Sequence, residues 1–416
     1  MNVEELVREV LREQADGQPP APAGFADRVL GARRRRRTRR LASVAAATAA
    51  VLAIAVGAPM LASGHGRSEV RPLGVVGPDG EQAHPDQSPP RRLIGAGDAV
   101  MAAYYTARIR PQSDERAVSA RTYWLLDPRT GTYRKDPRWS FAAVAPGLRT
   151  AAVLERNLPA HRIGLLDLAT GEVERWIPVR RGVGGLEFSY DGARLVATTY
   201  DDDPDLRIKE ELTRADGGRE WTWSAPFGDS SRSGFYDLDV RSGAGRWSPV
   251  ASGRRDLDSR ADFAYSRTGR LVYTQYIGGR DGLQRFYDLR GREVAAPADE
   301  RYLRSDVPAR LSPSGRLAAL GLTKEVAGDP GRSYSSIRDP RTGKEITKVR
   351  GGHLLAWADE RHLIAWERVT SLEEEYRPRL VLVTLGSDKV VPLSGVREPD
   401  SPTALTESWQ PVFARR

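Results

Sequence analysis

Residues 188–200 have the sequence FSYDGARLVATTY, in which the polar turn Tyr190-Asp191-Gly192 separates two apolar runs. Asp and Gly favour tight turns, and the run from Arg194 to Tyr200 is rich in β-branched side chains. The stretch therefore predicts two β-strands joined by a short turn. A similar run, LVYTQY at 271–276, follows another Gly turn and predicts a strand as well.

This turn recurs along the chain with a regular spacing. Other copies lie at 145–147, 267–269, 313–315 and 358–360, with a weaker one around 96–98. From Gly147 onward the intervals are 45, 77, 46 and 45 residues, so one interval holds about 30 extra residues. A second turn, an acidic residue followed by a glycine turn, alternates with the first at 127–131, 167–171, 239–243, 288–291, 339–343 and 385–388.

A repeat of 40–45 residues with two turns is typical of a four-stranded blade of a β-propeller. Six such units fit residues 93–395. The segments Phe188–Leu195 and Leu311–Leu317, each followed by an acidic Gly turn, resemble the WD-like repeats of TolB-type propellers. This resemblance implies a six-bladed ring that binds proteins or ligands on one face, and it transfers no catalytic residue. The Trp-Asp dipeptide and structural His of full WD blades are not matched.

A membrane segment is predicted upstream of the repeats. Residues 41–62 carry no charged side chain, and a helix of this length spans the ~30 Å hydrocarbon core. An arginine cluster precedes it, formed by Arg33, Arg34, Arg35, Arg36, Arg37, Arg39 and Arg40. By the positive-inside rule the N-terminus is cytoplasmic and the C-terminal domain extracellular, with the arginines on anionic lipid. A cleaved signal peptide ending near Leu61-Ala62-Ser63 remains the alternative.

The sequence thus predicts an all-β protein, a six-bladed β-propeller of four-stranded blades preceded by a single transmembrane helix and a short helical cytoplasmic tail. Its segments are a basic cytoplasmic tail (1–40), the transmembrane helix (41–62), a Pro/Gly-rich tether (63–92) and the extracytoplasmic propeller (93–416). We expect single-pass anchoring in the cell membrane.

Composition excludes several classes of function. The 416 residues contain no Cys, which excludes disulfides, thiolate zinc sites and thiol catalysis. Residues 1–40 contain ten arginines and six acidic residues, so they account for much of the net charge of +9. The charge that remains on the rest of the chain, about +5, is too dilute for nucleic-acid binding. The excess of Arg over Lys is typical of a high-GC genome of the actinobacterial kind.

The long interval predicts an insertion at about 201–234. Between Gly192 and Gly243 there are 51 residues, whereas the corresponding intervals elsewhere are 22 to 28. Its aromatic residues are candidates for binding a partner, namely Trp221, Trp223, Phe227 and Phe235. The alternative is that Trp221 and Trp223 only pack along one face of a longer hairpin. Either way, we expect the insertion to add little to the core of the ring.

Metal sites have weak support in the sequence. An acidic run in the insertion supplies weak calcium candidates, Asp201, Asp202, Asp203 and Asp205, and the alternative is a solvated loop. His353 and His362 flank a turn at 358–361, and a register centred on that turn predicts the pairs His353–Trp366, Leu355–Ile364 and Trp357–His362. The two histidines would then lie ~13 Å apart, too far to share an ion.

No catalytic motif appears. The chain lacks the G-x-S-x-G and H-E-x-x-H patterns, and the run Gly182-Val-Gly-Gly185 lacks the Lys and the helix of a phosphate loop. We therefore expect a non-catalytic binding or scaffold module for an envelope protein or ligand, without cofactor. Two alternatives remain. One is a transmembrane sensor that relays ligand binding to residues 1–40, and the other is a glycosidase-like hydrolase, which needs only two facing carboxylates.

Overall fold

The computed structural model describes residues 81–213, 219–226, 230–251, 260, 262–276, 283–325, 333–368, 377–397 and 408–416. The regular secondary structure in these ranges consists of β-strands, so the all-β prediction is confirmed there. No helix within them is long and apolar enough to cross a membrane. The predicted tail (1–40) and transmembrane helix (41–62) lie outside the described residues.

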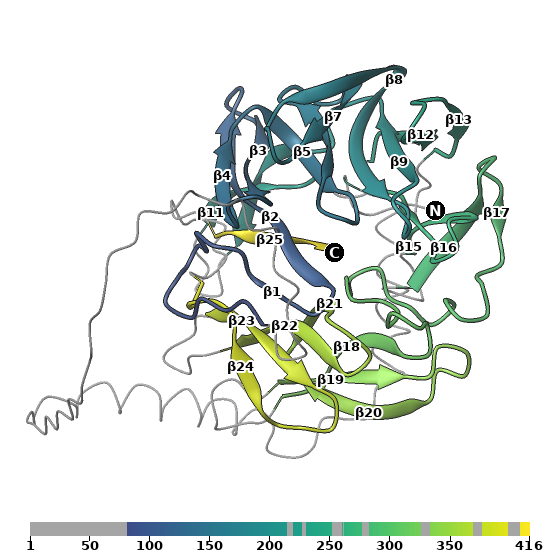
Figure 1. Ribbon diagram of the computed structural model, residues 1–416. Coiled ribbons are helices and arrows are strands. Elements are labelled where there is room, and N and C mark those ends of the chain that lie inside the picture. Colours follow the sequence, from purple (N-terminus) through teal and green to yellow (C-terminus); the bar gives the residue numbers. More distant parts are fainter. Residues whose placement is uncertain are drawn as a thin grey trace, which may run out of the picture. The chain divides into compact units, whose positions relative to one another are not determined.

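Five antiparallel sheets make up the described fold, and each is built mainly of strands that follow one another in the chain (Figure 1). The first sheet combines both ends of the domain. It contains β1 (Gly95–Ala96), β2 (Ala99–Pro111), β3 (Arg116–Asp127), β4 (Thr132–Asp136), β10 (Leu206–Thr213), β11 (Arg219–Ser224) and β25 (Gln410–Arg415).

The second sheet has seven strands because one strand belongs to two meanders. It contains β5 (Trp139–Val144), β6 (Thr150–Glu155), β7 (Ala160–Asp167), β8 (Val173–Phe188), β9 (Arg194–Tyr200), β12 (Arg232–Asp239) and β13 (Gly245–Pro249). The first part of β8 pairs with β7, and from Val183 onward it pairs with β9.

The remaining sheets are simple meanders. The third sheet contains β14 (Ala264–Tyr265), β15 (Leu271–Tyr276), β16 (Leu283–Asp288) and β17 (Glu293–Val294). The fourth contains β18 (Ala318–Glu325), β19 (Ser333–Arg338) and β20 (Glu345–Arg350). The fifth contains β21 (His353–Trp357), β22 (His362–Arg368), β23 (Pro378–Thr384) and β24 (Val390–Pro392). All the sheets stand around a common centre as the blades of a β-propeller (Figure 1).

The turn glycines hold the geometry that the sequence predicted. In both turn series they have φ between 49° and 84°, the left-handed region that a glycine adopts without strain. Gly97 has a second constraint, because a Cβ there would lie 2.2 Å from the carbonyl oxygen of Ala358. The turn of the first sheet therefore packs directly on the turn of the last.

One predicted register is partly wrong. The observed pairs are His353–Trp366, Leu354–Ala365, Ala356–Ile364 and Trp357–Leu363. The pair at the open end of the hairpin is confirmed, but a β-bulge at Leu355 shifts the register by one residue toward the turn. Trp357 therefore pairs with Leu363 instead of His362, and Leu355 is released from its predicted partner to face the centre of the ring.

The insertion forms a hairpin, β10–β11, that joins a sheet other than its own. It leaves the second sheet after β9, and Leu206, Arg207 and Ile208 of β10 then pair with β3 of the first sheet. The expectation that the insertion is peripheral to the ring is therefore wrong, since its backbone hydrogen bonds connect two sheets.

The C-terminal segment fastens the first and last sheets. β25 pairs with β2, and Trp409 just before it is only 2% exposed. The Trp409 ring packs 6.0 Å from Tyr104 and 5.2 Å from Trp366, centroid to centroid. Its Nε1 donates a hydrogen bond of 3.1 Å to the hydroxyl of Ser88. A single side chain thus contacts three separate parts of the domain.

Trp409→Ala should reduce the free energy of unfolding by about 3–5 kcal/mol, because it removes a large buried ring and leaves a cavity. Trp221→Ala is the matched control, since Trp221 is 58% exposed and its loss should change stability by no more than about 0.5 kcal/mol. Urea unfolding of the full chain, followed by tryptophan fluorescence and circular dichroism, measures both. Equal effects would contradict the role of Trp409 in closing the ring.

Candidate functional site

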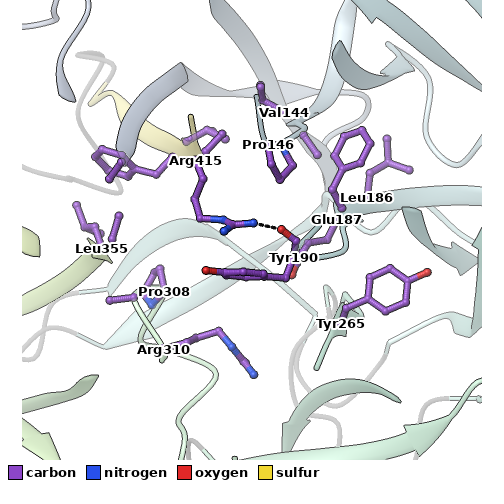
Figure 2. Close-up of a pocket in the computed structure, with 18 of the residues that line it drawn as sticks. Val144, Pro146, Leu186, Glu187, Tyr190, Tyr265, Pro308, Arg310, Leu355 and Arg415 are labelled. Atoms are coloured by element: carbon purple, nitrogen blue, oxygen red, sulfur yellow. Dashed lines mark hydrogen bonds between the residues drawn. The ribbon is translucent and has the colours of Figure 1, made fainter. Parts of the chain in front are cut away.

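A cavity of about 620 Å³ lies at the centre of the ring. Its wall receives residues from four of the five sheets and from the segment 308–313, which precedes β18, and Figure 2 shows part of this lining. The volume is in the range of small-molecule sites, which also tend to be concave and largely preformed. The cavity is therefore the candidate binding site.

One mouth of the cavity is built by the first turn series of the sequence. Pro146, Tyr190, Arg267 and Pro313 line the cavity, and each lies in one of these turns. The turns gather because the inner strand of each meander ends at the same face of the ring. The period of about 45 residues thus marks one rim of the site, which we call the turn rim.

Between the two ends, the wall is largely aliphatic. Val144 of β5, Leu186 of β8 and Leu355 of β21 all line the cavity, with Pro308 nearby (Figure 2). Val412 of β25 completes this belt. Such a belt offers apolar surface to a ligand, and burying that surface is worth about 25 cal/mol per Å².

The end of the cavity away from the turn rim is closed by paired charges. Arg121 of β3 donates two hydrogen bonds, of 2.7 and 2.8 Å, to the carboxylate of Asp205. Arg260 donates to Asp205 at 3.0 Å and to Asp262 at 2.8 Å. Asp262 also accepts a hydrogen bond of 2.8 Å from the hydroxyl of Tyr200. These side chains come from both of the larger sheets and from the segment before β14.

This cluster explains why the insertion belongs to the core. Asp205 is 5% exposed and lies at the entry to β10, between Arg121 and Arg260. Removing one partner of a buried ion pair typically costs about 3–5 kcal/mol, because the other charge stays buried without compensation. Asp205 therefore holds the insertion on the ring through two guanidinium groups.

The same geometry argues against the predicted calcium site. Both carboxylate oxygens of Asp205 are engaged by arginines, and Asp203 accepts the backbone N–H of Asp205 at 2.8 Å. Asp201 and Asp202 are exposed. Within the residues that the structure describes, no group of three or more Asp, Glu or His side chains is arranged to hold a metal ion. The nearby guanidinium charges also oppose a cation.

The predicted aromatic partner site is not assembled as one surface. Trp221 and Trp223 pair with Glu211 and Lys209, so both tryptophans lie on one face of the β10–β11 hairpin. Trp221 is exposed, Trp223 is half-buried, and the Lys209 ammonium lies 5.4 Å from the Trp221 ring centroid. Phe235 is fully buried in the core, and Phe227 lies outside the described residues.

Sequence reasoning missed Glu187. Its side chain lines the cavity, and removal of the carboxyl from bulk solvent there raises the pKa of Glu187 to about 7. Arg310 opposes the rise and Asp262 adds to it. The available signal was an acidic residue within the apolar inner part of β8, directly after Gly182-Val-Gly-Gly185. The backbone of Gly185 packs closely against the Asp262 carboxylate, since a Cβ on Gly185 would lie 2.1 Å from Asp262 Oδ1.

The turn rim carries two arginines stacked on one tyrosine. The guanidinium carbons of Arg267 and Arg415 lie 3.5 and 3.3 Å from the ring centroid of Tyr190. Arg415 donates a hydrogen bond to the carbonyl of Tyr190 (Figure 2), and Arg267 donates to the carbonyls of Ser312 and Pro313. Neither guanidinium forms an ion pair with a carboxylate of the described residues.

No protein-family model and no curated protein matches the chain. Among solved structures, it is similar to TolB from Acinetobacter baumannii, with 16% identity, 74% of this chain and 67% of that chain covered, and a TM-score of 0.37. It is also similar to hydrazine synthase from Kuenenia stuttgartiensis, with 16% identity, 64% of this chain and 69% of that chain covered, and a TM-score of 0.35. The Cps50 (Swd1) β-propeller domain from Myceliophteria thermophila shares 15% identity, with 70% of this chain and 97% of that chain covered and a TM-score of 0.31.

Glu187→Gln should flatten the dependence of stability on pH. The raised pKa means that the folded protein holds a proton that the unfolded chain releases near pH 4.5, so wild-type stability falls as the pH rises from there to about 7. The variant should therefore melt above the wild type at pH 8.5, with the difference shrinking toward pH 5. Thermal melts across this range measure it.

Glu174→Gln is the control, because Glu174 is an exposed residue of the same strand, β8. Its pH profile should match that of the wild type. Parallel profiles for the wild type and Glu187→Gln would contradict the protonation of Glu187 in the folded cavity.

Proposed function

We propose that this protein is a membrane-anchored extracytoplasmic binding module that takes a small ligand, or a short segment of a partner protein, into the central cavity of its propeller. The observation that carries the proposal is the cavity itself. It combines an aliphatic belt with charged groups at both ends, which is the composition of a binding site.

The proposal includes a ring of six blades. Since β8 serves two meanders, the second sheet divides into β5–β8 and β8–β9–β12–β13. The bridge Leu311–Ala318 adds an inner strand to β18–β20, and β25 adds one to β2–β4. With β14–β17 and β21–β24, these give six four-stranded units, in keeping with the repeat in the sequence.

A non-catalytic role agrees with how Asp205 and Asp262, at the end of the cavity away from the turn rim, are used. Asp262 is held by Arg260 and Tyr200, and Asp205 by two arginines. Their hydrogen bonds connect the insertion, β3, β9 and the segment before β14. These groups therefore act as structural supports for the site.

Membrane anchoring rests on the sequence, in which seven arginines directly precede the uncharged run 41–62. With epitope tags at both ends, protease added outside intact spheroplasts should remove the C-terminal tag and leave the N-terminal tag intact. Lysis should then expose both. Protection of the C-terminal tag before lysis would overturn the proposed orientation.

Filling the cavity should abolish ligand binding. Ala143 of β5 lines the cavity between Ala142 and Val144, which line it too, and it is less buried than either neighbour. In a thermal-shift screen of small compounds, some should stabilise the full chain, by about 2.7 kcal/mol at 100 times the Kd. Ala143→Trp should lose these shifts.

The control Ala295→Trp, at an exposed position outside the cavity wall, should retain the shifts of the wild type. A compound that stabilises all three proteins equally binds elsewhere. If every stabilising compound behaves in this way, the cavity is not the binding site.

A further inference from the structure

We infer that the turn rim binds the anionic head group, a carboxylate or a phosphate, of a small ligand whose apolar part lies against the aliphatic belt. This inference rests on the proposed function and names the chemical class of the ligand. It is carried by Arg267 and Arg415, which we call the rim arginines, and by Arg310 on the cavity wall.

The rim arginines are held in place with donors to spare. Tyr190 stacks with both guanidinium planes, and backbone carbonyls accept hydrogen bonds from each. A guanidinium has five N–H donors, and these bonds use only part of them. Two fixed guanidinium groups at one rim can bind an oxyanion with little loss of side-chain entropy, since they are already ordered.

The rim arginines stand outside the ion pairs of the cavity, although Asp98 also lines the cavity and Glu300 accepts the backbone N–H of Arg267 at 2.8 Å. Neither rim arginine is paired with a carboxylate of the described residues, whereas Arg121 and Arg260 at the far end are paired with Asp205 and Asp262. Burial lowers the pKa of Arg267, and the neighbouring charge of Arg415 lowers it further. Since both guanidinium groups stack on the Tyr190 ring, an anion bound at the edge of this stack would favour the charged form of Arg267.

Arg310 places a third guanidinium on the cavity wall. Its Nη2 pairs with Glu300 at 2.5 Å, but its Nη1 is buried without a hydrogen-bond partner. The guanidinium also stacks 3.9 Å from the ring centroid of Tyr273, so the ring and Glu300 fix Arg310 on the cavity wall. Arg310 also has φ of 49°, a strained conformation for a residue with a side chain, and such strain is concentrated at ligand sites.

Glu187 makes this binding depend on pH. The charged or titratable groups that interact with it are Arg310, Asp262, Tyr265 and Tyr273. When Glu187 is protonated it is neutral, and it then does not offset the positive charge of Arg310. Ionisation near pH 7 adds a negative charge to the cavity, which repels an anion. Anion affinity should therefore fall as the pH rises, whereas the affinity for a neutral ligand should not.

The test compares two anions with a neutral analogue of similar shape. Equilibrium dialysis of the full chain in detergent would use 3-phenylpropionate, phenyl phosphate and 3-phenylpropionamide. We expect at least one anion to bind about tenfold more tightly than the amide, since a charge-assisted hydrogen bond contributes more than a neutral one. Which anion binds more tightly distinguishes a carboxylate from a phosphate ligand.

Arg267→Gln and Arg415→Gln should each weaken anion binding about tenfold and leave amide binding unchanged. Arg415→Lys should retain part of the anion affinity. Arg241→Gln is the matched control, because it removes the same charge from an exposed position outside the cavity and should change nothing. Should a Gln variant fail to fold, wild-type binding at pH 6 and pH 8.5 still tests the inference, with a loss at pH 8.5 expected for the anions alone.

Equal affinity for anion and amide, or no binding of either anion, would overturn the inference. The proposed function is tested separately. If the amide binds the wild type and not Ala143→Trp, the cavity is a binding site even though it does not select anions. If the anions bind Ala143→Trp as well as the wild type, the anion site lies outside the cavity and the inference fails, whereas amide binding still decides the proposed function.

Discussion

The pairing of β25 with β2 is the constraint on which the rest of the structure depends. The C-terminal strand hydrogen-bonds to the inner edge of the first sheet, where backbone groups would otherwise remain unpaired. The same strand brings Val412 into the aliphatic belt and Arg415 to the turn rim. Closing the ring and completing the candidate site are therefore one event, and Trp409 reinforces it from the adjoining segment.

The charges of the cavity are divided between two tasks. At one end Arg121 and Arg260 are neutralised by Asp205 and Asp262, and they bind the insertion to the ring. At the turn rim, Arg267 and Arg415 are held by an aromatic ring and by carbonyls, which fix their positions and leave their charge uncompensated. An arginine paired with a carboxylate supports structure, whereas one fixed by neutral groups stays available to a ligand.

The insertion shows how burial changes the meaning of a motif. An acidic run followed by a proline suggests a solvated loop, and its spacing from neighbouring repeats suggests an appendage. In the fold, however, Asp205 is buried and its carboxylate meets two arginines that are 84 and 55 residues away in the chain. Nothing local in the sequence predicts such partners, because the repeats between them decide which side chains converge.

The sequence by itself determined the repeat, since its glycines and acidic turn residues act locally through backbone conformation and hydrogen bonds to their own turns. It also predicted strands such as β9 and β15, and it is the whole basis for the proposed membrane segment. Only the tertiary structure decided the bulge at Leu355, the burial of Phe235, the raised pKa of Glu187 and the pairing of each arginine. Those properties depend on the groups that other blades bring near, and a local pattern carries no information about them.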